Sequence, residues 1–206
     1  MSAKAVSIKD VCHVFTRSLS EIDEETLLNA EEALASWIGL IDILDGLTIE
    51  NERIKTIVED TKSELFKDIN ISIVMSASEN YSAACVLARG CIEKCVYILY
   101  FIDHPMIAFR WSMNNEDLSF SAIAEEMSTQ NYFEAATGKN ILGPNKPSTL
   151  IAELRKLYRR YSESVHGKYR YTETHKGKAE VGKEYYSTIK QSANTLKAIV
   201  KIRRGE

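Results

Sequence analysis

Residues 81–102, YSAACVLARGCIEKCVYILYFI, form the stretch that decides the fold class. Apolar side chains recur there every three or four residues, which is the period of an α-helix. The helix must stop before Pro105, because a residue that precedes proline disfavours helical geometry. Its longest apolar run, Cys91–Ile102, is too short for a membrane span and carries Glu93 and Lys94. We therefore expect a buried helix with the following residues facing inward: Tyr81, Cys85, Ala88, Ile92, Cys95, Val96 and Leu99.

Upstream of this stretch the helical period continues. An apolar stripe over residues 27–44 (Leu27, Leu34, Trp37, Ile38, Ile41, Leu44) ends at Gly46, a predicted helix C-cap. Thr48 is predicted to cap a second helix, whose stripe covers residues 54–73. The alternation within residues 69–73 also fits a strand, but the four-residue spacing favours a helix.

Downstream, the pattern predicts short helices before two longer ones. The short pieces are expected at 106–113, 118–127 and 131–136. Residues 138–147 hold two glycines and two prolines and are predicted to form a loop. Ser148 is predicted to cap the next helix, and Gly167 is predicted to end it. Residues 181–200 carry the apolar stripe of a final helix.

These elements predict an all-α, up-and-down bundle of four to five main helices with short helices between them. A chain of 206 residues fits a single domain over 1–206, with N-terminal helices in 1–79 and a core in 80–206. Three prolines and nine glycines are too few for many short strands. The N-terminus lacks the pattern of a signal peptide, so we expect a cytoplasmic protein.

The cysteines show no metal-binding pattern. Cys12, Cys85, Cys91 and Cys95 include no CxxC pair and have no histidines at ligand spacing. Cys91 and Cys95 are one helical turn apart, which is typical of small core residues. We expect neither a zinc site nor any other metal or cofactor.

Charge is distributed unevenly along the chain, although the net charge is only −3. Residues 1–138 hold 10 Lys/Arg against 23 Asp/Glu, whereas residues 139–206 hold 16 against 6. A basic C-terminal third is typical of a surface that binds a polyanion. Alternatively, the two ends neutralise each other within one bundle or across a dimer.

The basic third contains the motif LYRRYSESVHGKY at residues 157–169. Arg159 and His166 are seven residues apart, so on a helix they lie on nearly the same face, whereas Arg160 points partly away. Arginine can hold a phosphate, and histidine can carry a proton near neutral pH. Arginine and histidine side chains in the last turns of a helix also complement the negative C-terminal end of the helix dipole. The spacing alone therefore also fits a purely structural role.

Metal-free cleavage of RNA needs a base for the 2′-hydroxyl, an acid for the leaving 5′-oxygen and a cation for the phosphate. Arg159, Arg160 and His166 are the candidate catalytic residues, and a dimer would supply a second histidine. Supporting roles are assigned to Ser162, Glu163, Arg89 and Glu93. Arg89 and Glu93, one helical turn apart, also fit a half-buried ion pair that fixes helix packing. The candidate RNA-binding residues are Arg155, Tyr161, Lys168, Tyr169, Arg170 and Tyr171.

The motif resembles that of the HEPN superfamily of all-α proteins from toxins and phage-defence systems. Catalytic members carry an arginine and a histidine near a helix end, separated by four to six intervening residues. Arg160-YSESV-His166 and Arg159-RYSESV-His166 both fit, and Ser162-Glu-Ser-Val-His166-Gly167 is similar to a motif of uncharacterised bacterial defence-associated HEPN-like proteins. The resemblance covers residues 80–200 and implies a HEPN-like core, a dimer with a composite site, and metal-independent chemistry. Many catalytic members have Asn, Asp or His directly after the arginine. In this sequence Arg159 is followed by Arg160, and Arg160 is followed by Tyr161.

Two functional hypotheses follow from these residues. The first is a metal-independent endoribonuclease of HEPN type in a toxin or phage-defence context, with RNA as substrate and a homodimer as the active form. A cognate antitoxin or defence partner would then accompany it. The second is a non-catalytic HEPN-like dimeric module that binds nucleic acid, a nucleotide or a partner protein. A further alternative is a toxin silenced by modification of Tyr169 or Tyr171.

Overall fold

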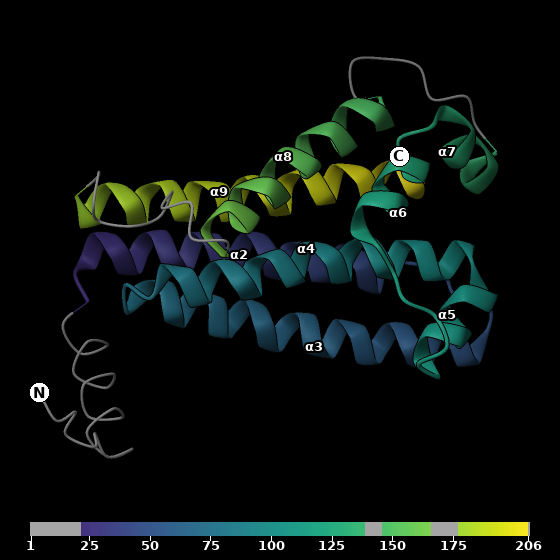
Figure 1. The fold of residues 1–206 in the computed structure, drawn as a ribbon, viewed down its shortest axis with the longest axis horizontal. Coiled ribbons are helices and arrows are strands. Elements are labelled where there is room, and N and C mark those ends of the chain that lie inside the picture. Colours follow the sequence, from purple (N-terminus) through teal and green to yellow (C-terminus); the bar gives the residue numbers. More distant parts are fainter. Residues whose placement is uncertain (1–21, 139–145, 166–176, 206) are drawn as a thin grey trace, which may run out of the picture.

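The computed structural model describes residues 22–138, 146–165 and 177–205. All regular structure in these ranges is α-helical, which confirms the predicted all-α class (Figure 1). The helices are α2 Glu24–Asp45, α3 Glu52–Ala77, α4 Tyr81–Asp103, α5 Pro105–Ser112, α6 Phe120–Met127, α7 Gln130–Thr137, α8 Pro147–Val165 and α9 Lys178–Arg203.

The long helices α2, α3, α4, α8 and α9 alternate in direction, so they form an up-and-down bundle (Figure 1). The first three are consecutive antiparallel neighbours, and α9 runs beside α2 in the same direction. The helix α8 packs across α4 and α9. The short helices α5, α6 and α7 gather near the C-terminal end of α4, and α6 also contacts α8.

The central element of the bundle is α4, the stretch 81–102 of the sequence. It packs against α3, α5, α6, α8 and α9. Its cysteines, Cys85, Cys91 and Cys95, are free thiols that are buried with the apolar side chains around them. The helix ends before Pro105 as predicted, but this proline also begins α5, where its fixed φ fits the first helical position.

The predicted helix ends are partly confirmed. Gly46 caps α2, and residues 69–73 are helical rather than extended. The prediction that Thr48 caps the second helix is wrong, because Asn51 accepts hydrogen bonds from two backbone N–H groups of the first turn of α3. Ser148 is not a cap either, since α8 begins one residue before it.

Burial on α2 differs from the predicted stripe. Trp37 is fully buried, and its indole N–H donates to the carbonyl of Ile189 in α9 at 3.2 Å. Leu27 and Ile38 were expected to face inward but are 49% and 41% exposed. The reason is that α2 lies at the edge of the bundle, where α3 and α9 cover only part of its circumference.

Hydroxyl groups join α9 to α3 inside the core. The hydroxyl oxygens of Ser72 and Tyr185 are 2.5 Å apart, and the Ser76 hydroxyl donates to the Tyr186 hydroxyl oxygen at 3.1 Å. Hydrogen bonds of this kind compensate the burial of polar atoms. They fix α9, and therefore the neighbouring α8, against the rest of the bundle. None of the helices within 22–138, 146–165 and 177–205 is both long and apolar enough to cross a bilayer.

Candidate nucleic-acid interface

The helix α8 separates apolar from basic side chains. One side is buried against α4, α6 and α9, with Leu150, Ile151, Leu154, Leu157 and Tyr161 facing inward. The opposite side exposes Arg155, Lys156 and Arg159. Each residue advances the viewpoint by about 100° around a helix, so Arg155 and Arg159, four residues apart, are neighbours on this exposed side.

Within the described residues, the exposed basic side chains of α8 lack acidic partners, whereas several basic side chains of α9 have them. On α9, Lys183 pairs with Glu25 at 2.9 Å and Lys190 with Glu32 at 2.7 Å, so the acidic α2 neutralises part of the basic third. Among the described residues, Arg155, Lys156 and Arg159 form no ion pair. Neutralisation within one bundle is therefore confirmed for part of α9, and the described part of α8 keeps an uncompensated basic surface.

The two candidate arginines of the motif lie on different sides of α8. Arg160 is half-buried and seven residues after Glu153, so the two share one side of the helix. That side faces α9, because Gln191 of α9 donates to the Glu153 carboxylate at 2.7 Å. Arg159 lies about 100° away on the exposed side, next to Arg155. The geometry thus separates Arg159, on the open basic surface, from Arg160 at the α8–α9 contact.

A polar cluster fixes α8 against α4 beside this surface. The Tyr158 hydroxyl donates to Glu93 Oε1 at 2.6 Å, and Arg89 Nε donates to the same oxygen at 3.3 Å. The Arg89 guanidinium lies 5.1 Å from the centre of the Tyr158 ring, which stacks on Phe120 of α6 with centroids 4.0 Å apart. The predicted Arg89–Glu93 ion pair is confirmed, whereas Tyr158 and Phe120 were not predicted as its partners.

The cluster also shifts the titration of its members. Burial and the hydrogen bond to Glu93 raise the pKa of Tyr158, so its phenol stays protonated and donates. Burial opposes the charged form of Arg89, but the neighbouring Tyr158 and Glu93 raise the pKa of its guanidinium overall. Ser162, a predicted supporting residue, donates to the Tyr158 carbonyl at 3.1 Å, a bond within α8.

The other predicted site residues divide into buried, half-buried and undescribed ones. Tyr161 is fully buried, so the prediction that it stacks on an RNA base does not hold. The Glu163 side chain is half-buried. His166 lies outside the described residues, as do Lys168, Tyr169, Arg170 and Tyr171. No group of three or more His, Cys, Asp or Glu side chains is arranged to hold a metal ion in the described parts of the chain.

The basic surface includes a depression between α6 and α8, with a volume of about 540 Å³. Ser128, the C-cap of α6, forms one wall. The other lining residues all come from α8: Ser148, Ile151, Ala152, Arg155, Lys156 and Arg159. A depression bordered by three cations is the described feature best suited to an anionic ligand.

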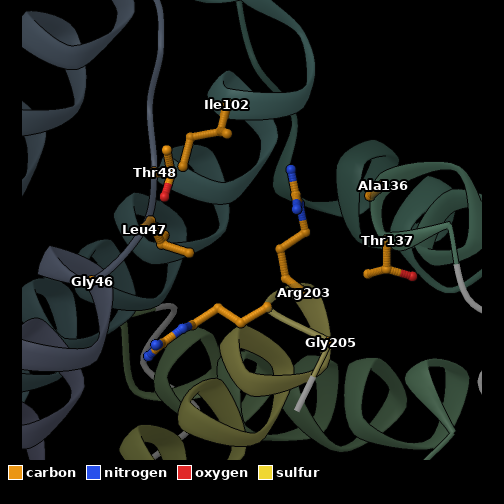
Figure 2. Close-up of a pocket in the computed structure, with 9 residues that line it drawn as sticks. Gly46, Leu47, Thr48, Ile102, Ala136, Thr137, Arg203 and Gly205 are labelled. Carbon is orange, nitrogen blue, oxygen red and sulfur yellow. The ribbon is translucent and has the colours of Figure 1, made fainter.

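A second basic cavity, of about 390 Å³, lies where the C-terminal ends of α2, α4, α7 and α9 meet (Figure 2). Arg203 extends between Ile102 on one side and Ala136 and Thr137 on the other. Its Nε donates to both carboxylate oxygens of Asp103, at 2.9 and 3.2 Å.

The charge of this second cavity is already compensated. The Tyr132 hydroxyl also donates to Asp103, at 2.7 Å. Arg204 lies against the end of α2, since a Cβ added to Gly46 would be 3.4 Å from its Nη1 atom. Cations stabilise helix C-termini, where carbonyl groups leave a partial negative charge. Arg203 is therefore held in an ion pair and Arg204 lies at a helix end, so the candidate interface is the surface of α8.

Comparison of the chain with models of known protein families, with curated proteins and with solved structures gives no match.

Proposed function

We propose that this protein binds RNA through the exposed surface of α8 and cleaves it as a metal-independent, HEPN-type endoribonuclease. The observation that carries the proposal is the set of three exposed cations, Arg155, Lys156 and Arg159, without ion-pair partners among the described residues. RNA presents a line of phosphates to such a surface, and neutralising them releases counterions. Glu25 and Glu32 of α2 pair with lysines of α9, and no described acidic residue pairs with the three cations of α8.

Arg159 and His166 carry the chemistry in this proposal. The 2′-oxygen of the ribose attacks the phosphorus, and the bond to the 5′-oxygen breaks. The 2′-hydroxyl proton goes to one histidine, and a second histidine gives a proton to the leaving 5′-oxygen. Arg159 holds the charge that develops on the phosphate oxygens. The products are a 2′,3′-cyclic phosphate and a 5′-hydroxyl end.

A homodimer completes this scheme, because one motif supplies only one histidine as proton carrier. The Tyr158–Glu93–Arg89 cluster would orient the part of α8 that carries Arg159. The cellular setting that we propose is a cytoplasmic toxin or defence system with a partner that restrains the enzyme. The resemblance of the motif to HEPN proteins, rather than any contact in the structure, supports this setting.

The test is cleavage of end-labelled single-stranded RNA in excess EDTA. We expect wild-type protein to leave 2′,3′-cyclic phosphate ends, and both His166→Ala and Arg159→Ala to slow cleavage by about 100-fold or more. Arg160→Ala should have a smaller effect, because its side chain lies toward α9. Lys183→Ala removes a cation that is already paired with Glu25 and is the matched control.

Circular dichroism should show the same helical content and melting temperature for every variant used. Equal inactivity of the wild type and His166→Ala would refute the ribonuclease. If the wild type then still bound RNA, the protein would be the non-catalytic binding module.

A further inference from the structure

We propose that the depression between α6 and α8 is a subsite for one unpaired nucleotide of the RNA. The base would occupy the hollow, and its phosphate would lie against the arginines at the edge of the hollow. This inference rests on the proposed function. It specifies that the bound RNA is unpaired at this site and that one of its bases lies in the depression.

The hollow results from small side chains on neighbouring helices. Ser148 and Ala152 are one turn apart on α8, and Ser128 faces them from the end of α6. One and two turns further along, α8 carries the long side chains of Arg155 and Arg159 on the same side. Small residues followed by long cationic ones create a recess with a positive edge.

The chemistry of the lining suits a nucleobase better than a phosphate alone. Ala152 contributes exposed apolar surface, against which the face of a planar ring can lie, and the buried Ile151 lies beneath it. The Ser128 hydroxyl donates to the Glu125 carbonyl at 2.6 Å, so its oxygen remains an acceptor for the edge of a base. Ser148 contributes a second hydroxyl. A guanidinium plane such as that of Arg155 can stack on a base as well as bind a phosphate.

An unpaired nucleotide fits this arrangement, and a base pair does not. In duplex RNA the bases are stacked inside, so the exposed surface of a helix would meet phosphates, sugars and base edges but not the face of a base. A base can enter a recess only after it leaves the stack, and this costs least in single strands and loops. The volume of about 540 Å³ lies within the range of small-molecule sites.

The test compares binding of single-stranded and duplex RNA of the same sequence by fluorescence anisotropy. The His166→Ala chain serves as background, so that cleavage does not disturb the equilibrium. Ala152→Leu fills the recess without changing charge, and Ala35→Leu makes the same change at an exposed position of α2, which does not line the depression. We expect Ala152→Leu to weaken single-strand binding by about tenfold, which corresponds to about 1.4 kcal/mol. Duplex binding and the Ala35→Leu chain should not change.

Several outcomes would overturn the subsite. One is equal affinity of the background chain for single-stranded and duplex RNA, and another is equal behaviour of Ala152→Leu and Ala35→Leu. Displacement of the RNA by poly-glutamate as readily as by unlabelled RNA would point to an acidic peptide ligand and would also overturn it.

The subsite and the proposed function can fail separately. If wild-type protein cleaves RNA but Ala152→Leu binds normally, the subsite fails and the ribonuclease stands. If cleavage is absent but Ala152→Leu still weakens single-strand binding, the ribonuclease fails and the subsite stands.

Discussion

At the scale of single residues, the neighbours of a basic side chain decide what it can bind. Lys183 and Lys190 lie on α9 opposite glutamates of α2, whereas Arg155 and Arg159 on α8 face no described acid. An exposed ion pair contributes little to stability, but it lowers the charge available to a ligand. Cations on α8 and α9 therefore differ in the charge that they offer to a ligand.

This difference predicts the salt dependence of RNA binding. Each phosphate of a single strand that a cation neutralises contributes about 0.7 to the slope of log K against log salt. We expect Arg159→Ala to reduce the slope by about this amount, measured by anisotropy over a range of NaCl concentrations. Lys183→Ala should leave the slope unchanged. The same slope for wild type and Arg159→Ala would show that Arg159 touches no phosphate.

At the scale of elements, one tyrosine sets how α8 lies on α4. Tyr158 joins the two helices through Glu93, which is 65 residues away in the chain, and stacks on Phe120 of α6. The hydrogen bond limits rotation of α8 about its axis, and this rotation sets the direction of Arg155 and Arg159. The cluster is thus the structural support of the basic surface.

Tyr158→Phe should lower the free energy of unfolding by about 1.5–3 kcal/mol at neutral pH, the usual range for a hydrogen bond to a charged group. Tyr97→Phe is the control, since the Tyr97 hydroxyl donates to the uncharged Leu118 carbonyl at 3.2 Å, and we expect a loss of about 0.5–1.5 kcal/mol. Urea unfolding measures both. Equal losses in the two variants would show that the charge of Glu93 does not strengthen the bond.

The same experiment has a defined pH dependence. Burial and the bond to Glu93 raise the pKa of Tyr158 in the folded protein above its unfolded value of about 10. A raised pKa stabilises the fold fully below the unfolded value and less as the pH rises through the folded value. The stability difference between wild type and Tyr158→Phe should therefore narrow above about pH 10.

At the scale of the whole molecule, contacts at the end of the bundle shown in Figure 2 join the last helix, α9, to α4 and α7. Arg203 of α9 binds Asp103 of α4, 100 residues away, and Tyr132 of α7 donates to the same carboxylate. Asp103 is only 11% exposed, so its charge depends on these partners. The contact ties the final helix to the central one.

Arg203→Ala should lower the free energy of unfolding by about 3–5 kcal/mol, because it leaves a buried carboxylate without its cation. Lys201→Ala, an exposed position two residues earlier, should change it by no more than about 0.5 kcal/mol. Urea unfolding with tyrosine and tryptophan fluorescence checks both. If Arg203→Ala lowered the free energy of unfolding by less than about 1 kcal/mol, solvent would already compensate the charge of Asp103.

The sequence alone determined the features that depend on local periodicity. The apolar spacing of residues 81–102 predicted the central helix, because one buried side of a helix repeats every three or four residues. The same reasoning predicted the Arg89–Glu93 pair, whose members are one turn apart. Tyr161 was predicted from the sequence to bind RNA, and only its burial in the structure excluded that role.

Tertiary structure decided everything that depends on residues far apart in the chain. Which cations are neutralised follows from α2 lying beside α9, a contact between residues such as Glu32 and Lys190 that are 158 positions apart. The Tyr158–Glu93 bond and the hollow between Ser128 and Ala152 arise in the same way, from packing between helices. Periodicity shows which side of a helix is buried, but not which other helix covers it. The physical reason is that helix geometry is fixed by neighbours within four residues, whereas packing partners are chosen by the shape and charge of the whole bundle.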